Sequence, residues 1–286
     1  MDSSRQAVQA GQAARTARFL QLHQGPRILV LPNAWDAASA RLFESLGFPA
    51  VATTSAGVAN SLGYPDGEHL PFDDLLTVIR WITRAVHVPV TADIEAGFGK
   101  TADEVAAAVQ QVIAAGAVGI NLEDSTGPTD NPLAEISVQV AKIKAVRATA
   151  ESVGVPLVIN ARTDVYLAGV GDPASRLAHT VQRLNAYRAA GADCLFAPGV
   201  SDAATIAALA REVHGPLNVL AVRGTPPAPE LERLGVRRVS VGSGPARAAL
   251  TLVRRIGQEL LSTGTYSSFT EGSMTYAEAN QLFQHD

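Results

Sequence analysis

The chain has 286 residues, 47% of them hydrophobic, with 23 basic and 27 acidic side chains and a formal net charge of −4 at pH 7. This length allows one large core, and the scattered charges give no electrostatic footprint for nucleic acid or anionic lipid. One cysteine gives no basis for a disulfide framework and indicates a reduced, cytoplasmic protein. No apolar run approaches the roughly 20 residues that span a bilayer. We therefore expect a small-molecule ligand, and neither nucleic acid nor a membrane as a partner.

The first 24 residues alternate alanines with charged and amide side chains and contain no continuous apolar stretch. A secretory signal would need such a stretch. This segment is therefore predicted to be a surface helix.

Eight short runs rich in Val, Ile and Leu predict strands. They cover residues 27–34, 49–55, 88–95, 118–124, 155–164, 193–199, 217–222 and 237–243. Alanine-rich stretches with helical spacing lie between them, such as 101–116 and 172–191. The chain thus repeats one strand–helix unit.

The joints between a predicted helix and the next strand also repeat. Each places a glycine where a left-handed helix end is wanted: Gly47, Gly116, Gly191 and Gly235. Eight such units predict a closed (β/α)8 TIM-type barrel over residues 1–262, including the N-terminal helix, with a C-terminal helical extension over 263–286. An open doubly wound sheet is the alternative, but the segment LPNAWDAAS after the first strand lacks the glycines of its phosphate loop.

Polar residues end several of the apolar runs, where such a barrel carries its chemistry. They are Thr54 and Ser55, Asp93 and Glu95, Glu123 and Asp124, and Arg162 and Asp164. Side chains alternate faces along a strand, so Asp93 and Glu95 are expected to point together into the mouth. Converging acids repel one another unless a cation neutralises them, and Mg²⁺ prefers carboxylate oxygens. Helix capping is the other explanation for acids that precede a helix.

No histidine or cysteine cluster has the spacing of a zinc site. The six histidines are scattered, and we expect them to lie on the surface or to pack helices. Cys194 lies in the apolar run CLFAP and is expected to be buried and structural.

Four ordered segments resemble the isocitrate lyase / phosphoenolpyruvate mutase superfamily: TTSAGVANSLGYPDGE, TADIEAGFG, AGAVGINLEDS and VINARTDVY. The similarity extends from about residue 31 to residue 244. It implies a (β/α)8 barrel that binds Mg²⁺, with Mn²⁺ as a substitute, and that makes or breaks bonds beside the carbonyl group of a 2-oxo acid.

The resemblance also implies roles for individual residues. Asp93, Glu95 and Glu123 would form the metal shell, with Glu95 where the family has a second aspartate. The implied substrate-binding residues are Thr54, Ser55, Ala56, Asp93 and Arg162. The implied catalytic residues are Asp66, Glu123 and Arg162. Arg162 would pair with the distal anionic group of the substrate, which its planar guanidinium suits.

The chain departs from the family in the loop after Glu123 and Asp124. Isocitrate and methylisocitrate lyases carry a Lys-[KR]-Cys-Gly-His gating loop there, whereas this chain reads STGPTDNPLAEIS. The lysine pattern of the mutases and phosphonopyruvate hydrolases is also missing, with Thr129 and Asn131 as faint remnants. Cleavage of an isocitrate-like substrate needs an acid to protonate the departing carbanion, and this loop offers none.

Loss of CO₂ from a 2-oxo diacid does not need such an acid in the loop, because Mg²⁺ can stabilise the enolate and water can protonate it. The expected function is therefore a Mg²⁺-dependent carbon–carbon lyase or decarboxylase acting on a small 2-oxo dicarboxylate such as oxaloacetate. Three alternatives remain: a mutase or phosphonopyruvate hydrolase using the turn SVGSGPARAAL for phosphate, a methylisocitrate lyase-like enzyme, and a non-catalytic 2-oxo acid binding protein. The family also implies a homo-oligomer, a dimer or tetramer, with subunit contacts through the C-terminal extension.

Overall fold

The computed structural model describes residues 2–127 and 129–284. Its strands form one parallel sheet: β1 (Leu29–Leu31), β2 (Asn33–Ala34), β3 (Val51–Thr53), β4 (Val90–Asp93), β5 (Gly119–Glu123), β6 (Val158–Arg162), β7 (Cys194–Phe196), β8 (Leu217–Leu220) and β9 (Arg238–Ser240). β1 pairs with β9 and β2 pairs with β3. Only Pro32 separates β1 from β2, so one interrupted strand closes the sheet, and a proline there cannot donate to the ladder. The eight predicted strands and the barrel are confirmed, and the open sheet is excluded.

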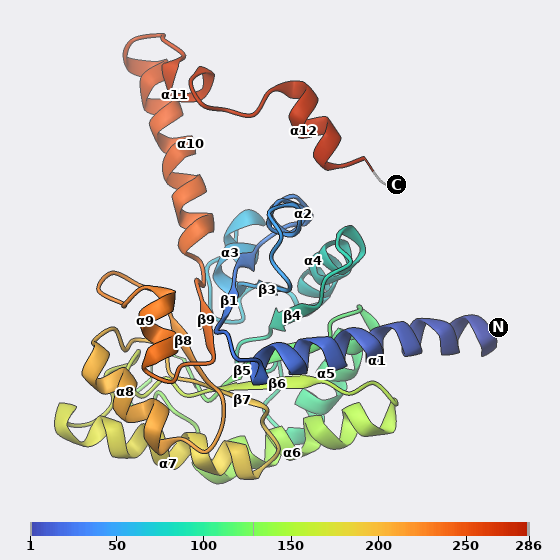
Figure 1. Cartoon of the computed structure of the whole chain (residues 1–286), viewed down its shortest axis with the longest axis vertical. Helices are drawn as coiled ribbons and strands as arrows, with labels where there is room; N and C mark the ends of the chain where they lie inside the picture. Colours follow the sequence, from blue (N-terminus) through green and yellow to red (C-terminus); the bar gives the residue numbers. More distant parts are fainter. Residues whose placement is uncertain (1, 128, 285–286) are drawn as a thin grey trace.

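Helices alternate with the strands and surround the barrel (Figure 1). They are α1 (Asp2–Gln24), α2 (Ala37–Ser45), α3 (Ser55–Ser61), α4 (Phe72–Ala85), α5 (Ala102–Ala114), α6 (Ile136–Ser152), η1 (Pro173–Ser175), α7 (Arg176–Ala189), α8 (Ala203–Glu212), α9 (Ala228–Arg233), α10 (Gly244–Ser262), α11 (Ser267–Thr270) and α12 (Tyr276–Leu282). The four predicted joint glycines all have positive φ: 88° at Gly47, 97° at Gly116, 112° at Gly191 and 94° at Gly235. No helix in the described ranges is long and apolar enough to cross a membrane.

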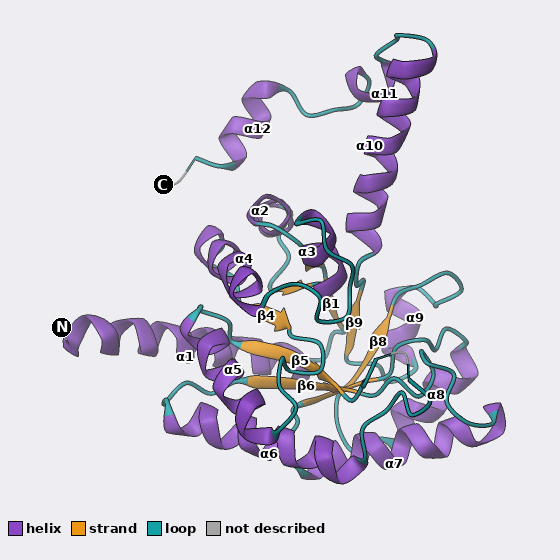
Figure 2. Cartoon of the chain, turned by 180° about the vertical axis from the view of Figure 1, so that it is seen from behind, coloured by secondary structure: helices purple, strands orange, loops and turns teal. Residues whose placement is uncertain are grey.

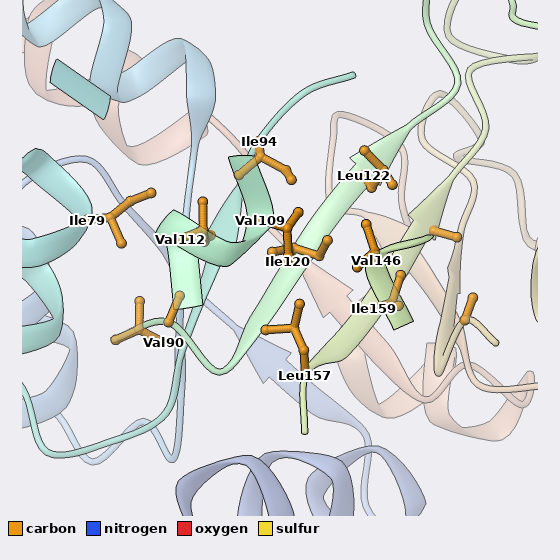
Figure 3. Packing of buried hydrophobic residues seen from close by; sticks show 14 of the residues in the cluster. Ile79, Val90, Ile94, Val109, Val112, Ile120, Leu122, Val146, Leu157 and Ile159 are labelled. Atoms are coloured by element: carbon orange, nitrogen blue, oxygen red, sulfur yellow. The ribbon is translucent and has the colours of Figure 1, made fainter. Parts of the chain in front are cut away.

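The main core lies between the outer face of the strands and the surrounding helices. Figure 3 shows Ile120 and Ile159 of β5 and β6 packed against Val109 and Val146 of α5 and α6. All four side chains are fully buried. This packing fixes the directions of β4 to β6, whose C-terminal ends carry the candidate site.

The expectation that the N-terminal segment is only a surface helix is wrong for its second half. Gln12, Thr16, Phe19 and His23 of α1 are buried. Phe19 packs with Leu29 and Val158 at the N-terminal end of the barrel. These four residues are spaced by three and four positions and form one buried stripe of the helix. Three of the four side chains are polar, so the hydrophobic pattern of the sequence did not reveal it.

The helix after the last strand leaves the barrel. Only Ala246 of α10 is buried, and α10 projects outward with α11 at its tip (Figures 1 and 2). α12 returns toward α2, where Arg41 Nε donates to the carbonyl of Leu282 at 3.1 Å. Leu250, Val253 and Leu261 of α10 are 52%, 63% and 91% exposed.

Candidate active site

A cavity of about 140 Å³ opens at the C-terminal ends of the strands. It brings together six of the predicted site residues: Thr54, Ser55, Ala56, Asp66, Asp93 and Arg162. Glu95 and Glu123 line an adjoining hollow of about 380 Å³, together with Glu68 and Lys142. The predicted residues thus converge on the mouth of the barrel, divided between two neighbouring spaces.

Asp93, the last residue of β4, is held in one orientation by three contacts. Its Oδ1 accepts from Asn121 Nδ2 at 2.9 Å and its Oδ2 accepts from the Ser55 N–H at 3.0 Å. Its own N–H donates to Thr53 Oγ1 at 2.8 Å. The carboxylate is therefore fixed at the cavity wall, with lone pairs left for a further ligand.

Capping of the helix that follows them in the chain does not explain these acids. The next helix, α5, is capped by Thr101, whose side chain accepts from the Glu104 N–H, while Glu104 accepts in return from the Thr101 N–H. Asp93 instead contacts the first residue of α3 across the site. The acids are thus available for another role.

Glu95 lies beyond the strand, so the predicted strand 88–95 is too long and the alternation argument does not apply to it. β4 ends at Asp93, and Glu95 has φ +51°. Glu68, with φ +56°, donates its N–H to Glu95 Oε2 at 2.7 Å, and its Oε1 accepts from the Phe98 N–H at 2.8 Å. Lys142 Nζ donates to the Ala96 carbonyl at 2.9 Å. Left-handed residues other than glycine store strain, which often accompanies a functional loop.

The glycines of this loop are required by close packing. A Cβ on Gly97, which has φ +108°, would lie 2.8 Å from Val105 Cγ1. A Cβ on Gly99 would lie 2.8 Å from the Val105 backbone nitrogen. The GFG sequence therefore lets the loop press against the start of α5, which holds Glu95 near Asp93.

The acids at the mouth raise one another's pKa values. Burial, then the charges of Asp93 and Asp66, raises the pKa of Glu95 to about 8. Partial burial and then Asp93 also raise the pKa of Asp66. Burial raises the pKa of Glu123 despite the attraction of Arg162. The site holds more negative charge than its own arginine neutralises.

Arg162, at the end of β6, is already paired with two carboxylates. Its Nε and Nη2 donate to the two oxygens of Asp164 at 2.5 and 2.8 Å, and its Nη1 lies 2.7 Å from Glu123 Oε2. Its guanidinium also lies 5.8 Å from the centroid of the Phe196 ring. These contacts occupy three of its five N–H groups, leaving two that could reach a substrate.

Two other strand-end or loop predictions have structural explanations. Asp124 Oδ2 accepts from Tyr187 Oη at 2.7 Å and from Arg183 Nη1 at 3.0 Å in a buried network, although Asp124 also borders the hollow that holds Glu95 and Glu123. The hydroxyl of Thr129 donates to the Asn131 carbonyl at 2.9 Å, within its own loop. Cys194 is confirmed as buried, and burial raises the pKa of its thiol to about 11.

Several polar residues of the barrel interior were missed by the sequence interpretation. Asn33, Asn121, Asn160, Asn218, Arg238 and Ser240 are buried and line the cavity or contact residues that do. Asn160 Nδ2 donates to Asn121 Oδ1 at 2.9 Å, which continues the contact to Asp93. For two of these residues a signal was present in the sequence. Asn121 in GINLE and Asn160 in VINAR each stand two residues before the polar residue that ends the strand.

The donor set fits a hard divalent cation. Among the described residues, no group of three or more His, Cys, Asp or Glu side chains is placed to hold a metal ion by itself. Mg²⁺ typically takes only one or two carboxylates, with water and substrate oxygens completing its shell. Asp93 offers a fixed carboxylate beside Glu95, whose pKa is raised by burial and then by the charges of Asp93 and Asp66.

Solved structures of similar chains support the fold. A protein of Burkholderia cenocepacia J2315, provisionally named a lyase/mutase, is 40% identical with a TM-score of 0.90, covering 96% of this chain and 98% of that chain. A phosphonopyruvate hydrolase in complex with oxalate and Mg²⁺ is 27% identical with a TM-score of 0.82, covering 94% of each chain.

Curated relatives include enzymes that carry out different reactions. The 2-methylisocitrate lyase of Escherichia coli (strain K12) is 31% identical over 258 residues, covering 87% of this chain and 84% of the relative. The oxaloacetate decarboxylase of Bradyrhizobium diazoefficiens is 30% identical over 211 residues, covering 71% and 70%. Residues 19–261 match the phosphoenolpyruvate phosphomutase family. The chain therefore belongs to the phosphoenolpyruvate mutase/isocitrate lyase superfamily.

Proposed function

We propose that this protein is a Mg²⁺-dependent carbon–carbon lyase or decarboxylase that acts on a small 2-oxo dicarboxylate such as oxaloacetate. The observation that carries the proposal is the crowding of Asp66 and Asp93, which line the cavity, with Glu95 of the adjoining hollow. Burial and then the neighbouring charges raise the pKa values of Asp66 and Glu95. The similar oxaloacetate decarboxylase and the Mg²⁺ and oxalate in the phosphonopyruvate hydrolase structure support it.

In this proposal Asp93 and Glu95 hold the metal, and Glu123 supports it from the neighbouring hollow. A bound Mg²⁺ supplies Lewis-acid stabilisation of the negative charge that develops as the carbon–carbon bond breaks. Thr54, Ser55 and Ala56 line the wall against which the substrate lies. The free N–H groups of Arg162 bind the distal carboxylate. Asp66, whose pKa is raised by burial and then by the Asp93 charge, lines the same cavity.

The loop after Asp124 favours decarboxylation over isocitrate cleavage. It offers no lysine, cysteine or histidine between Ser125 and Glu135. A carbanion leaving from an isocitrate-like substrate would therefore find no acid there. Solvent can protonate the product of decarboxylation.

One argument for a mutase or phosphonopyruvate hydrolase, the turn after the last strand as a phosphate site, is weakened by the contacts of that turn. The Val241 and Gly242 N–H groups both donate to Asn33 Oδ1 at 2.9 Å, and Pro245 lies in the first turn of α10. The turn that could have bound phosphate is thus already satisfied from within the chain.

The test is pyruvate release from oxaloacetate with and without Mg²⁺. Because the metal ion alone can promote this reaction, each rate is compared with Mg²⁺ without protein and with Asp93→Asn. We expect faster turnover of oxaloacetate or a close 2-oxo diacid than of isocitrate or 2-methylisocitrate. Efficient isocitrate cleavage, or phosphonopyruvate turnover with no activity on oxaloacetate, would contradict the proposal.

We also propose that α10 to α12 mediate homo-oligomerisation, as a dimer or tetramer. The apolar residues Val253 and Leu261 are more than half exposed on a helix that leaves the barrel. Such a surface on one chain indicates a protein partner. Light scattering of the wild type and of Val253→Glu/Leu261→Glu should show an oligomer and a monomer, respectively. A monomeric wild type at micromolar concentration would contradict this proposal.

A further inference from the structure

Arg238, in β9, is a buried cation without an acidic partner. Only 2% of its surface is exposed. The other buried arginine, Arg183, has its Nη1 3.0 Å from Asp124 Oδ2. Within residues 2–127 and 129–284, no carboxylate lies within ion-pair distance of Arg238. An uncompensated charge in a protein interior is costly, so this arginine calls for a counter-ion.

His23 contacts Arg238 without neutralising it. The His23 Nδ1 lies 2.8 Å from the Phe19 carbonyl, and its Nε2 lies 3.5 Å from Arg238 Nη1. Since a carbonyl only accepts, Nδ1 carries the hydrogen and Nε2 is left as an acceptor for the guanidinium. Burial, then Arg238, lowers the pKa of His23 to about 3, so the ring is neutral near pH 7. The histidine provides a dipole and no charge.

The guanidinium faces the same cavity as Asp93. Arg238 lines that cavity with Thr91 and Asn160. Each has a buried polar atom without a hydrogen-bond partner: Arg238 Nε, Thr91 Oγ1 and Asn160 Oδ1. A water molecule could satisfy these hydrogen bonds, but only an anion also supplies the missing charge.

The barrel interior leaves room for such an occupant. A barrel of this type is usually filled by layers of branched aliphatic side chains. Here Leu29 is the register partner of Arg238 on one side, but the cavity wall also carries the smaller residues Ala52, Thr91 and Ser240. The acids Asp66 and Asp93 lie at the outer end, so an anion is drawn to the inner end of the cavity.

We propose that a carboxylate-sized anion binds at the inner end of the cavity, at the wall lined by Arg238 and Thr91. It is either a second carboxylate of a 2-oxo acid seated at the mouth or a separate small anion. The proposal needs neither turnover nor a bound metal, so it stands or fails independently of the reaction proposed above.

The experiment measures formate binding by calorimetry and by thermal unfolding, in metal-free buffer at constant ionic strength set by a sulfonate too large for the cavity. The Tm of the wild type should rise with formate. Arg238→Met should weaken formate binding by about tenfold or more, because it removes a charge-assisted hydrogen bond. Arg237→Gln is the matched control, since Arg237 is the preceding residue of the chain and is exposed.

The stability of the variants separates ligand binding from a structural role. Arg238→Met should be at least as stable as the wild type without formate, because it removes an uncompensated charge. If it fails to fold, Arg238→Lys should keep a weaker response. A wild type that does not respond to formate, or an equal response in wild type and Arg238→Met, would overturn the proposal.

A 2-oxo diacid identifies the source of the anion. Competition between oxaloacetate and formate means that the carboxylate of the substrate reaches Arg238. Simultaneous binding means that the inner end takes a separate anion. Either result supports the proposed site if formate binding is lost in Arg238→Met.

Discussion

The two ends of the barrel are built on opposite principles. At the N-terminal end Phe19 packs against Leu29 and Val158, and every one of these side chains is buried. At the C-terminal end Asp93 and Glu95 are placed close together, although burial and then the Asp93 charge raise the pKa of Glu95. The same strands therefore end in packing that stabilises the fold on one side and in repulsion on the other. Because the fold maintains this repulsion between acidic side chains, we infer that the C-terminal end of the barrel is a ligand site.

The largest stability effect is expected at the packed end. Phe19→Ala should lower the free energy of unfolding by about 3–5 kcal/mol, because it leaves a cavity where the barrel is closed. Phe269→Ala, on a residue that is 40% exposed, is the control and should cost far less. Urea denaturation measures both. Equal, small losses would show that α1 does not close the barrel in solution.

Arg162 lies at the charged end of the barrel, but its ion pairs stabilise the fold. Arg162→Leu should destabilise the protein by about 3–5 kcal/mol at pH 7, since Glu123 and Asp164 would be left buried without a partner. The loss should be smaller when the change is made in a Glu123→Gln background. An identical loss in both backgrounds would mean that the Glu123 pair is not formed.

A substitution of Cys194 tests whether its thiol takes part in the reaction. Cys194→Ser places a hydroxyl in a fully buried position and should cost about 1–3 kcal/mol. Turnover per folded molecule should not change, because the thiol has a pKa of about 11 and lies away from the mouth. A loss of turnover in fully folded protein would show that the thiol takes part.

The smallest effect is a change in pH dependence. The pKa of Glu95 is about 8 in the folded metal-free protein and 4.5 as its ordinary value, so its stabilising contribution is full below about 4.5 and is lost as pH rises through about 8. Glu95→Gln should remove this decline, and Mg²⁺ should reduce it in the wild type. Thermal unfolding from pH 5 to 8.5 checks both, with Asp103→Asn as an exposed control. Parallel curves for wild type and Glu95→Gln would contradict the assignment.

The repeating unit was predictable because its signals are local. Apolar runs give the eight strands, and Gly47, Gly116, Gly191 and Gly235 mark the helix ends by a backbone requirement that a sequence displays directly. The convergence of Asp93 and Arg162 followed from the topology of a parallel barrel. The family resemblance supplied Asp66, which lies in a loop that no periodicity describes.

The missed features depend on contacts between distant segments. Polar side chains hid the buried stripe of α1, whose partners lie at the bottom of the barrel. The turn at Glu95 requires a left-handed residue supported by Glu68 and Lys142, and no local pattern indicates it. Arg238 lies in the sequence RRVSVGS, where nothing distinguishes it from the exposed Arg237 except the face of the strand that it occupies.

The central claim is that the acids of the mouth are held close together to bind a divalent cation, and a calorimetric titration with Mg²⁺ or Mn²⁺ tests it most directly. We expect one site in the wild type, unchanged affinity in Asp103→Asn on the exposed first turn of α5, and affinity about a hundredfold lower in Asp93→Asn, which removes a charged ligand. Identical metal affinity in the wild type and Asp93→Asn would contradict the account.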